Sequence, residues 1–118
     1  MSCKGDEKLR SSISIVYKTH LNPEVEISKF AYKEHASSDE ALSIRYILNF
    51  YEYLAVGINN KVYDESILKE SMYTSLINVY ERCESFIDVI RKNGQKTAFC
   101  NFEGLAKNWV SKPLKSNK

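Results

Sequence analysis

The sequence predicts an all-α, single-domain bundle of four to six helices around a central helix at about 38–58. Apolar residues recur at helical spacing over 38–58 and again over 65–92. Helix start and stop signals separate these stretches, and no pair of alternating apolar runs is present to form a sheet. A chain of 118 residues is of the size of one domain.

The central helix is apolar on nearly all sides, which is typical of the buried centre of a bundle. Ser37 and Glu40 form a capping-box pattern at its start, and Gly57, Asn59 and Asn60 mark its end. Its best apolar face consists of Ile44, Ile47, Leu48, Tyr51, Leu54, Ala55 and Ile58. Leu42, Tyr46, Phe50, Tyr53 and Val56 cover most of the remaining surface.

The segment before the central helix is less regular. Residues 1–8 are polar, and we expect them to be a disordered N-terminus. Over 9–17 the pattern fits a helix or a strand, and we favour a helix because a lone strand has no partner run. Asn22 and Pro23 predict the start of a short helix that ends near His35 to Ser37.

Helical spacing then extends from 65 to 92, with Asp64 as the expected N-cap and Gly94 just beyond the end. This stretch is long for a globular helix, so either one helix or two with a break near Glu84 fits. A last helix starts between Thr97 and Asn101. The helical domain is therefore predicted over 9–111, followed by a basic, flexible tail at 112–118.

The composition excludes several classes of protein. Net charge is +2, but residues 62–90 carry −4 and residues 91–118 carry +6. Cys3, Cys83 and Cys100 have no metal-ligand spacing and predict reduced thiols in the cytoplasm. We find no signal peptide, spanning segment, phosphate loop, metal motif or nucleophile elbow. The sequence thus predicts a cytoplasmic protein with no cofactor, no membrane partner and no catalytic residues.

Three polar residues, Arg45, Asn49 and Glu52, form one stripe on the central helix. Buried charges are normally paired, so we expect this stripe to join Arg91 and Glu103 in a structural polar network, with Arg82 as a further candidate partner. The alternative interpretation is an enzyme pocket built on Arg45, Asn49 and Glu52.

Aromatic and basic residues suggest two kinds of partner. Tyr32, Tyr53, Tyr63 and Tyr73 fall outside the best apolar faces and are candidates for a protein interface, because tyrosine is enriched there. Three lysines of the basic C-terminal third are candidate phosphate contacts for a nucleic acid: Lys107, Lys112 and Lys115. A solvated tail explains the lysines more simply, since no base-reading helix accompanies them.

The segments NFYEYLAVGINNKVYDESILKE (49–70), IRKNG (90–94) and FEGLAKNW (102–109) resemble a bacterial domain family of unknown function. The resemblance covers about 38–109 and implies a helical bundle; it brings no catalytic residue. Many members of that family carry an N-terminal membrane helix before a cytoplasmic domain, and this chain departs from them in having none. A soluble version, or one encoded by a phage or other mobile element, fits this departure.

Our leading hypothesis is a small cytoplasmic protein–protein interaction module that binds a host protein or a second copy of itself as a homodimer. The first alternative is a nucleic-acid-binding accessory protein that uses the basic C-terminal third. The second is the enzyme with a pocket on the Arg45, Asn49 and Glu52 stripe.

Overall fold

The computed structural model describes residues 4–21 and 26–114, which form four α-helices and two short 3-10 helices. In chain order these elements are α1 (Lys4–Leu21), η1 (Ile27–Ala31), η2 (Lys33–His35), α2 (Asp39–Asn59), α3 (Glu65–Lys92) and α4 (Cys100–Ser111). No strand occurs in these residues, so the all-α prediction is confirmed, with a helix number inside the predicted range.

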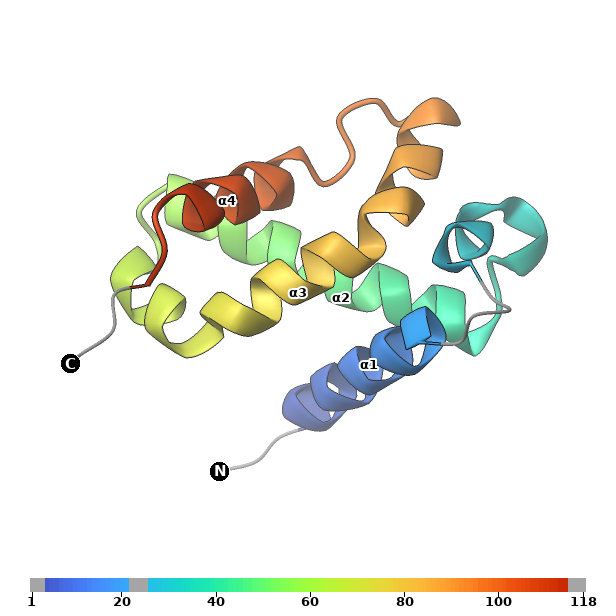
Figure 1. The fold of residues 1–118 in the computed structure, drawn as a ribbon, viewed down its shortest axis with the longest axis horizontal. Helices are drawn as coiled ribbons and strands as arrows, with labels where there is room; N and C mark the ends of the chain where they lie inside the picture. Colours follow the sequence, from blue (N-terminus) through green and yellow to red (C-terminus); the bar gives the residue numbers. More distant parts are fainter. Residues whose placement is uncertain (1–3, 22–25, 115–118) are drawn as a thin grey trace.

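Helix α2 lies at the centre of the arrangement. Helix α1 packs against α2 on one side and α4 packs against it on another, while α3 crosses α2 and contacts α1, η1 and α4 (Figure 1). Figure 1 shows α1 beside the N-terminal half of α2 and α4 beside its C-terminal half. The central position predicted for the helix at 38–58 is therefore confirmed.

The predicted apolar face of α2 supplies much of the core. Ile44, Ile47, Leu48 and Ala55 are completely buried. The expectation that α2 is buried on nearly all sides is wrong, however, because its neighbours cover it only in part. Leu42, Val56 and Tyr53 remain 55%, 40% and 71% exposed, so one long side of this helix faces solvent.

The start of α2 differs by one residue from the predicted capping box. Ser38, not Ser37, is the N-cap, and its Oγ accepts a hydrogen bond from the Ala41 amide at 3.1 Å. The same hydroxyl donates to the His35 carbonyl at 2.8 Å. Because η2 ends at His35, the chain turns one residue later than predicted, and Glu40 lies in the first turn without closing a capping box.

Helix α1 confirms the helical interpretation of 9–17 and extends it in both directions. It begins at Lys4, inside the segment 1–8 that was expected to be a disordered N-terminus, and residues 1–3 lie outside the described ones. Val16 is fully buried, and Ser12 and Thr19 on the same face are nearly so. The Lys8 ammonium lies 4.8 Å from the ring centroid of Tyr46 on α2, which ties the first turns of α1 to α2.

The short helix predicted before 35–37 is replaced by two 3-10 helices. Tyr32 separates them with an extended backbone, φ −85° and ψ 150°, which no continuous helix could include. Ile27, Phe30 and Ala31 of η1 are buried against α3. The predicted start at Asn22 and Pro23 lies outside the described residues.

Helix α3 runs unbroken from Glu65 to Lys92, so the single-helix alternative holds and there is no break near Glu84. Asp64 is its N-cap, as predicted, with Oδ1 accepting from the Ser66 and Ile67 amides. At the other end Gly94 has a φ of 117°, and the following amide of Gln95 donates back to the Ile90 carbonyl. This left-handed ending suits glycine, which has no Cβ to oppose it.

Helix α2 ends in the same kind of turn without a glycine. Lys61 has a φ of 63°, the Lys61 amide donates to the Ile58 carbonyl, and the Val62 amide donates to the Gly57 carbonyl at 2.8 Å. A lysine in the left-handed region brings its Cβ close to backbone atoms, whereas glycine adopts this region freely. Lys61 therefore holds a strained position that the closing hydrogen bonds maintain.

We expect Lys61→Gly to raise the free energy of unfolding by about 0.5 to 1 kcal/mol, because it removes the Cβ from a left-handed residue. Urea denaturation followed by circular dichroism measures this change. Asn60→Gly is the matched control: Asn60 has a φ of −97° and its side chain donates to the Val56 carbonyl, so this variant should be destabilised. Equal effects of the two substitutions would contradict the explanation by backbone strain.

Candidate functional site

The three polar residues of the stripe on α2 do not form one network, because each has different surroundings. Glu52 reaches α4: its Oε1 accepts from the Phe102 amide at 2.8 Å, and its Oε2 accepts from the Asn101 side chain at 2.7 Å. The N-cap of α4, Phe99, has no side-chain acceptor, so Glu52 satisfies an amide that this helix end leaves open. A carboxylate is also favoured at the positive end of the helix dipole.

Arg45 and Asn49 take no part in this contact. The Arg45 guanidinium lies 5.5 Å from the ring centroid of Phe86, and Asn49 is exposed to solvent. Arg82, the further candidate partner, lies 4.2 Å from the ring of Tyr17 on α1. The two hollows described below are lined by other residues than these three.

Glu103 is the centre of a second polar cluster, between α3 and α4. Its carboxylate forms ion pairs of 2.9 Å with Arg91 and with Lys107, and it accepts a hydrogen bond from the Tyr80 hydroxyl at 3.1 Å. Arg91 also donates from Nε to the Ala98 carbonyl, which holds the loop before α4. The structure therefore brings Arg91 and Glu103 together, but not with Glu52, Arg45 or Asn49.

This cluster changes the acidity of Glu103 and Tyr80. The hydrogen bond from Lys107, followed by those from Arg91 and Tyr80, holds the pKa of Glu103 below its ordinary value although partial burial opposes the shift. Burial, and then the neighbouring Glu103 carboxylate, raises the pKa of Tyr80. Both groups thus stay in one protonation state around neutral pH, which suits a structural contact better than proton transfer.

The four candidate interface tyrosines have different surroundings. Tyr53 and Tyr63 line one hollow of about 300 Å³ where α2 ends and α3 begins. Tyr32 is 45% exposed but lies between η1 and η2. Tyr73 packs on the core, with its ring stacked 6.2 Å from that of Trp109 on α4, so the structure does not place it with the others.

We call Tyr53, Val56, Val62 and Tyr63 the tyrosine surface. The sequence analysis missed Val56 and Val62 as members of it. Val56 was assigned to the buried helix, and it is 40% exposed; Val62, in the loop after α2, is 70% exposed. An apolar residue in a short polar loop was the available signal for Val62.

Gly57 lies directly beneath the Tyr63 ring of the tyrosine surface. A Cβ at this position would lie 2.3 Å from two atoms of the Tyr63 ring, so the ring rests directly on the glycine backbone. Tyr63 is further held by its amide, which donates to the Gly57 carbonyl. The wall of the hollow is therefore fixed by the end of α2.

The candidate phosphate contacts are not assembled into a basic site among the described residues. Lys107 is paired with Glu103. The backbone carbonyl of Lys112 accepts from the Lys69 ammonium, and Lys115 lies outside the described residues. Lys107 therefore already has an anionic partner within the protein.

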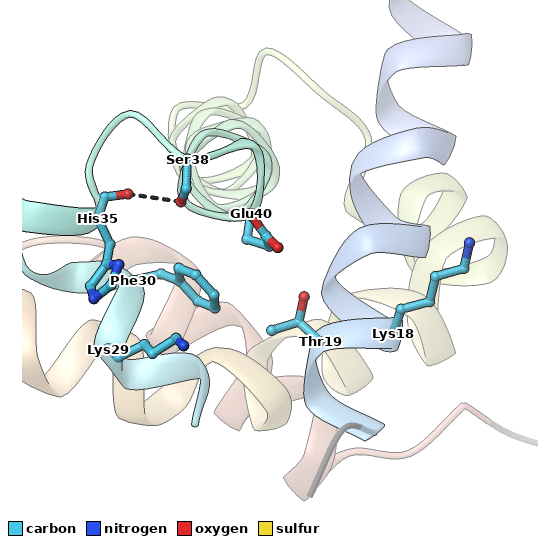
Figure 2. A pocket seen from close by; sticks show the side chains of 7 residues that line it. All are labelled: Lys18, Thr19, Lys29, Phe30, His35, Ser38 and Glu40. Carbon is cyan, nitrogen blue, oxygen red and sulfur yellow. Dashed lines mark hydrogen bonds between the residues drawn. The ribbon is translucent and has the colours of Figure 1, made fainter. Parts of the chain in front are cut away.

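A second, more polar hollow of about 460 Å³ lies between the end of α1, the 3-10 helices and the start of α2. Figure 2 shows the side chains that line it, with Thr19 from α1, Lys29 and Phe30 from η1, and Glu40 from α2 around the same space. We call it the polar hollow. No pattern in the sequence predicts it, because its lining residues come from separate elements, α1, η1, η2 and the start of α2.

Within residues 4–21 and 26–114, no group of three or more His, Cys, Asp or Glu side chains is placed to hold a metal ion. None of the described helices combines the length and the hydrophobicity that a bilayer crossing requires.

The chain belongs to a family of helical domains whose function is unknown. The family model described as "Domain of unknown function (DUF4760)" matches residues 2–109, and therefore nearly the whole sequence. The resemblance drawn from residues 38–109 is thus confirmed and extends further towards the N-terminus. The comparisons with curated proteins and with solved structures gave no match.

We expect Glu52→Ala to lower the free energy of unfolding by about 1 to 2 kcal/mol, because the Phe102 amide loses its acceptor at the start of α4. Urea denaturation measures the loss. Glu70→Ala, at an exposed position of α3, is the control and should change stability by less than about 0.5 kcal/mol. If both variants unfold alike, Glu52 does not hold α4.

The Glu103 cluster predicts an acid-sensitive contribution to stability. Since the pKa of Glu103 is lowered in the folded state, its contribution is present above the ordinary value of 4.5 and disappears as the pH falls through the folded pKa. Glu103→Gln should therefore lower stability near pH 7, and the difference from wild type should shrink as the pH falls below 4.5. Denaturation curves at several pH values test this, with exposed Glu81→Gln as the control; a difference that stays constant with pH would refute it.

Proposed function

We propose that the protein is a small interaction module that binds a partner protein through the tyrosine surface. The observation that carries the proposal is a group of apolar side chains exposed around one hollow, where Tyr53 is 71% and Val62 70% accessible. An exposed apolar cluster of this kind typically marks an interaction site on a soluble domain. Tyrosine adds a large rigid contact area and a hydroxyl that remains hydrated at the rim.

The lining of the hollow defines the partner that would fit. Tyr53, Val56, Gly57, Asn60, Val62 and Tyr63 line it, and none of these residues carries a charge. A large apolar side chain of the partner would therefore fill the hollow, with the Asn60 side-chain oxygen at its edge as an acceptor for a backbone amide of the partner. Because no charge takes part, such binding should depend little on salt.

The proposal includes a cytoplasmic location. Cys83 is buried and Cys100 exposed, and both are free thiols, as is usual in a reducing compartment. In its more specific form, the protein would be encoded by a phage or another mobile element and would bind a host protein. The small single domain supports this form, and the identity of a captured partner would test it.

We expect Tyr53→Lys to abolish retention of the partner in a tagged pull-down from the native host's lysate. The experiment compares wild type with Tyr53→Lys in low salt and in about 1 M NaCl, where the Debye length is only about 3 Å. Leu42→Lys is the matched control, since Leu42 is also an exposed apolar residue of α2, 55% accessible, and does not line the hollow. Wild type and Leu42→Lys should retain the same protein at both salt concentrations.

The proposal is wrong if Tyr53→Lys and Val62→Lys retain the same proteins as wild type. Circular dichroism of each variant shows whether the helices are intact, so loss of binding can be separated from loss of fold. Analytical ultracentrifugation supplies the second test. A wild-type dimer that Tyr53→Lys dissociates would make the partner a second copy of this chain and would keep the tyrosine surface as the interface.

A further inference from the structure

The polar hollow presents two opposite charges from different elements. Lys29 belongs to η1 and Glu40 to the first turn of α2, and both side chains are half-buried. Figure 2 shows the Lys29 ammonium and the Glu40 carboxylate entering the space from different sides, whereas the Lys18 ammonium extends away from it. A half-buried charge usually has a partner, so a partner is expected for both Lys29 and Glu40.

Neither group has an ion-pair partner among the described residues. The ion pairs found in the described residues are those of Glu103 with Arg91 and with Lys107, on α3 and α4. The Lys29 ammonium instead lies 5.2 Å from the ring centroid of Phe30. Within the described part of the chain, Lys29 and Glu40 are therefore available to charged groups of a molecule that enters the hollow.

The lining also contains a buried aromatic ring and a serine hydroxyl that is already bonded. Phe30 is only 5% exposed, and Figure 2 shows its ring beside the same space as Lys29 and Glu40. Edge-to-face packing against His35, with centroids 5.9 Å apart, fixes this ring. The Ser38 hydroxyl is committed to capping α2. The hollow thus offers a cation, an anion and an aromatic ring within about 460 Å³, a volume typical of small-molecule sites.

We propose that the polar hollow binds a small zwitterion of the α-amino acid class. The ligand carboxylate would pair with Lys29, its ammonium with Glu40, and its side chain would contact the Phe30 ring. Thr19, at the end of α1, adds a hydroxyl-bearing residue to the same wall. A singly charged ligand would pair with one of these groups and leave the opposite charge partly desolvated without a partner, which is unfavourable.

Glu40 has a second role that the experiment must separate from ligand binding. Asp39 and Glu40 both lie in the first turn of α2, where negative charge stabilises the helix end. Asp39 is exposed and does not line the hollow. Asp39→Asn therefore removes a comparable charge from the helix end without changing the hollow, and Lys33→Gln does the same for the lysine of the neighbouring η2.

The test uses the full chain and a panel of the common L-amino acids, each at millimolar concentration. Saturation-transfer NMR detects binding, and isothermal titration calorimetry measures the affinity of those that bind. We expect at least one apolar amino acid to bind, and Lys29→Gln and Glu40→Gln each to weaken it by about tenfold or more. Lys33→Gln and Asp39→Asn should stay within about twofold of wild type.

Ligand analogues give an independent readout that needs no substitution. For each amino acid that binds, the analogue without the ammonium and the analogue without the carboxylate should both bind at least about tenfold more weakly; for phenylalanine these are 3-phenylpropanoate and 2-phenylethylamine. Absence of binding by every amino acid overturns the proposal. Equal binding of the analogues and the parent compound also overturns it, as does an equal loss with Asp39→Asn and Glu40→Gln. None of these results bears on the tyrosine surface, which is formed by other residues.

Discussion

The stacking of Tyr51 on Phe102 is the contact on which the arrangement of the last three helices depends. Tyr51 of α2 is 2% exposed, and its ring lies 5.2 Å from that of Phe102 on α4, nearly parallel to it. Phe102 in turn meets the edge of Tyr80 on α3 at 5.6 Å. The Tyr51 hydroxyl bonds to Ser75 of α3 at 2.7 Å, so one buried side chain joins all three helices. Burial then raises the pKa of Tyr51, which keeps the hydroxyl neutral.

Polar contacts at the rim of this cluster fix the direction of α4. Glu52 binds its first turn from α2, and Glu65 of α3 accepts from the Trp109 indole in its last turn at 2.9 Å. Apolar packing buries the Tyr51 and Phe102 rings but accepts several orientations of α4, whereas these two carboxylates favour a single one. Glu52, one of the residues first considered for an enzyme pocket, thus aligns two helices, and the apolar tyrosine surface is left facing solvent.

Features that depend on residues close together in the sequence could be predicted from it. Helical period identified Ile44, Ile47 and Leu48 as core, and local capping chemistry identified Asp64 and Gly94 at the ends of α3. The cap of α2 was misplaced by one residue because its position depends on where η2 ends. Tyr53 and Tyr73 could not be distinguished, since Tyr73 is covered by Trp109 from a distant helix and Tyr53 is not. The groups that donate to Glu52, on Asn101 and Phe102, lie about fifty residues further along the chain, beyond any pattern of spacing.

The contact of Glu52 with the start of α4 has a consequence for the order of folding. It links residues 50 positions apart, and the whole of α3 lies in the loop that this contact closes. With 12 residues, α4 is too short to be a stable helix by itself in water. Its amides find the Glu52 carboxylate only after α3 has folded back across α2, so α4 should dock in a late step. The last helix of the chain would then act as the closing element of the bundle, and partial unfolding would begin with its release.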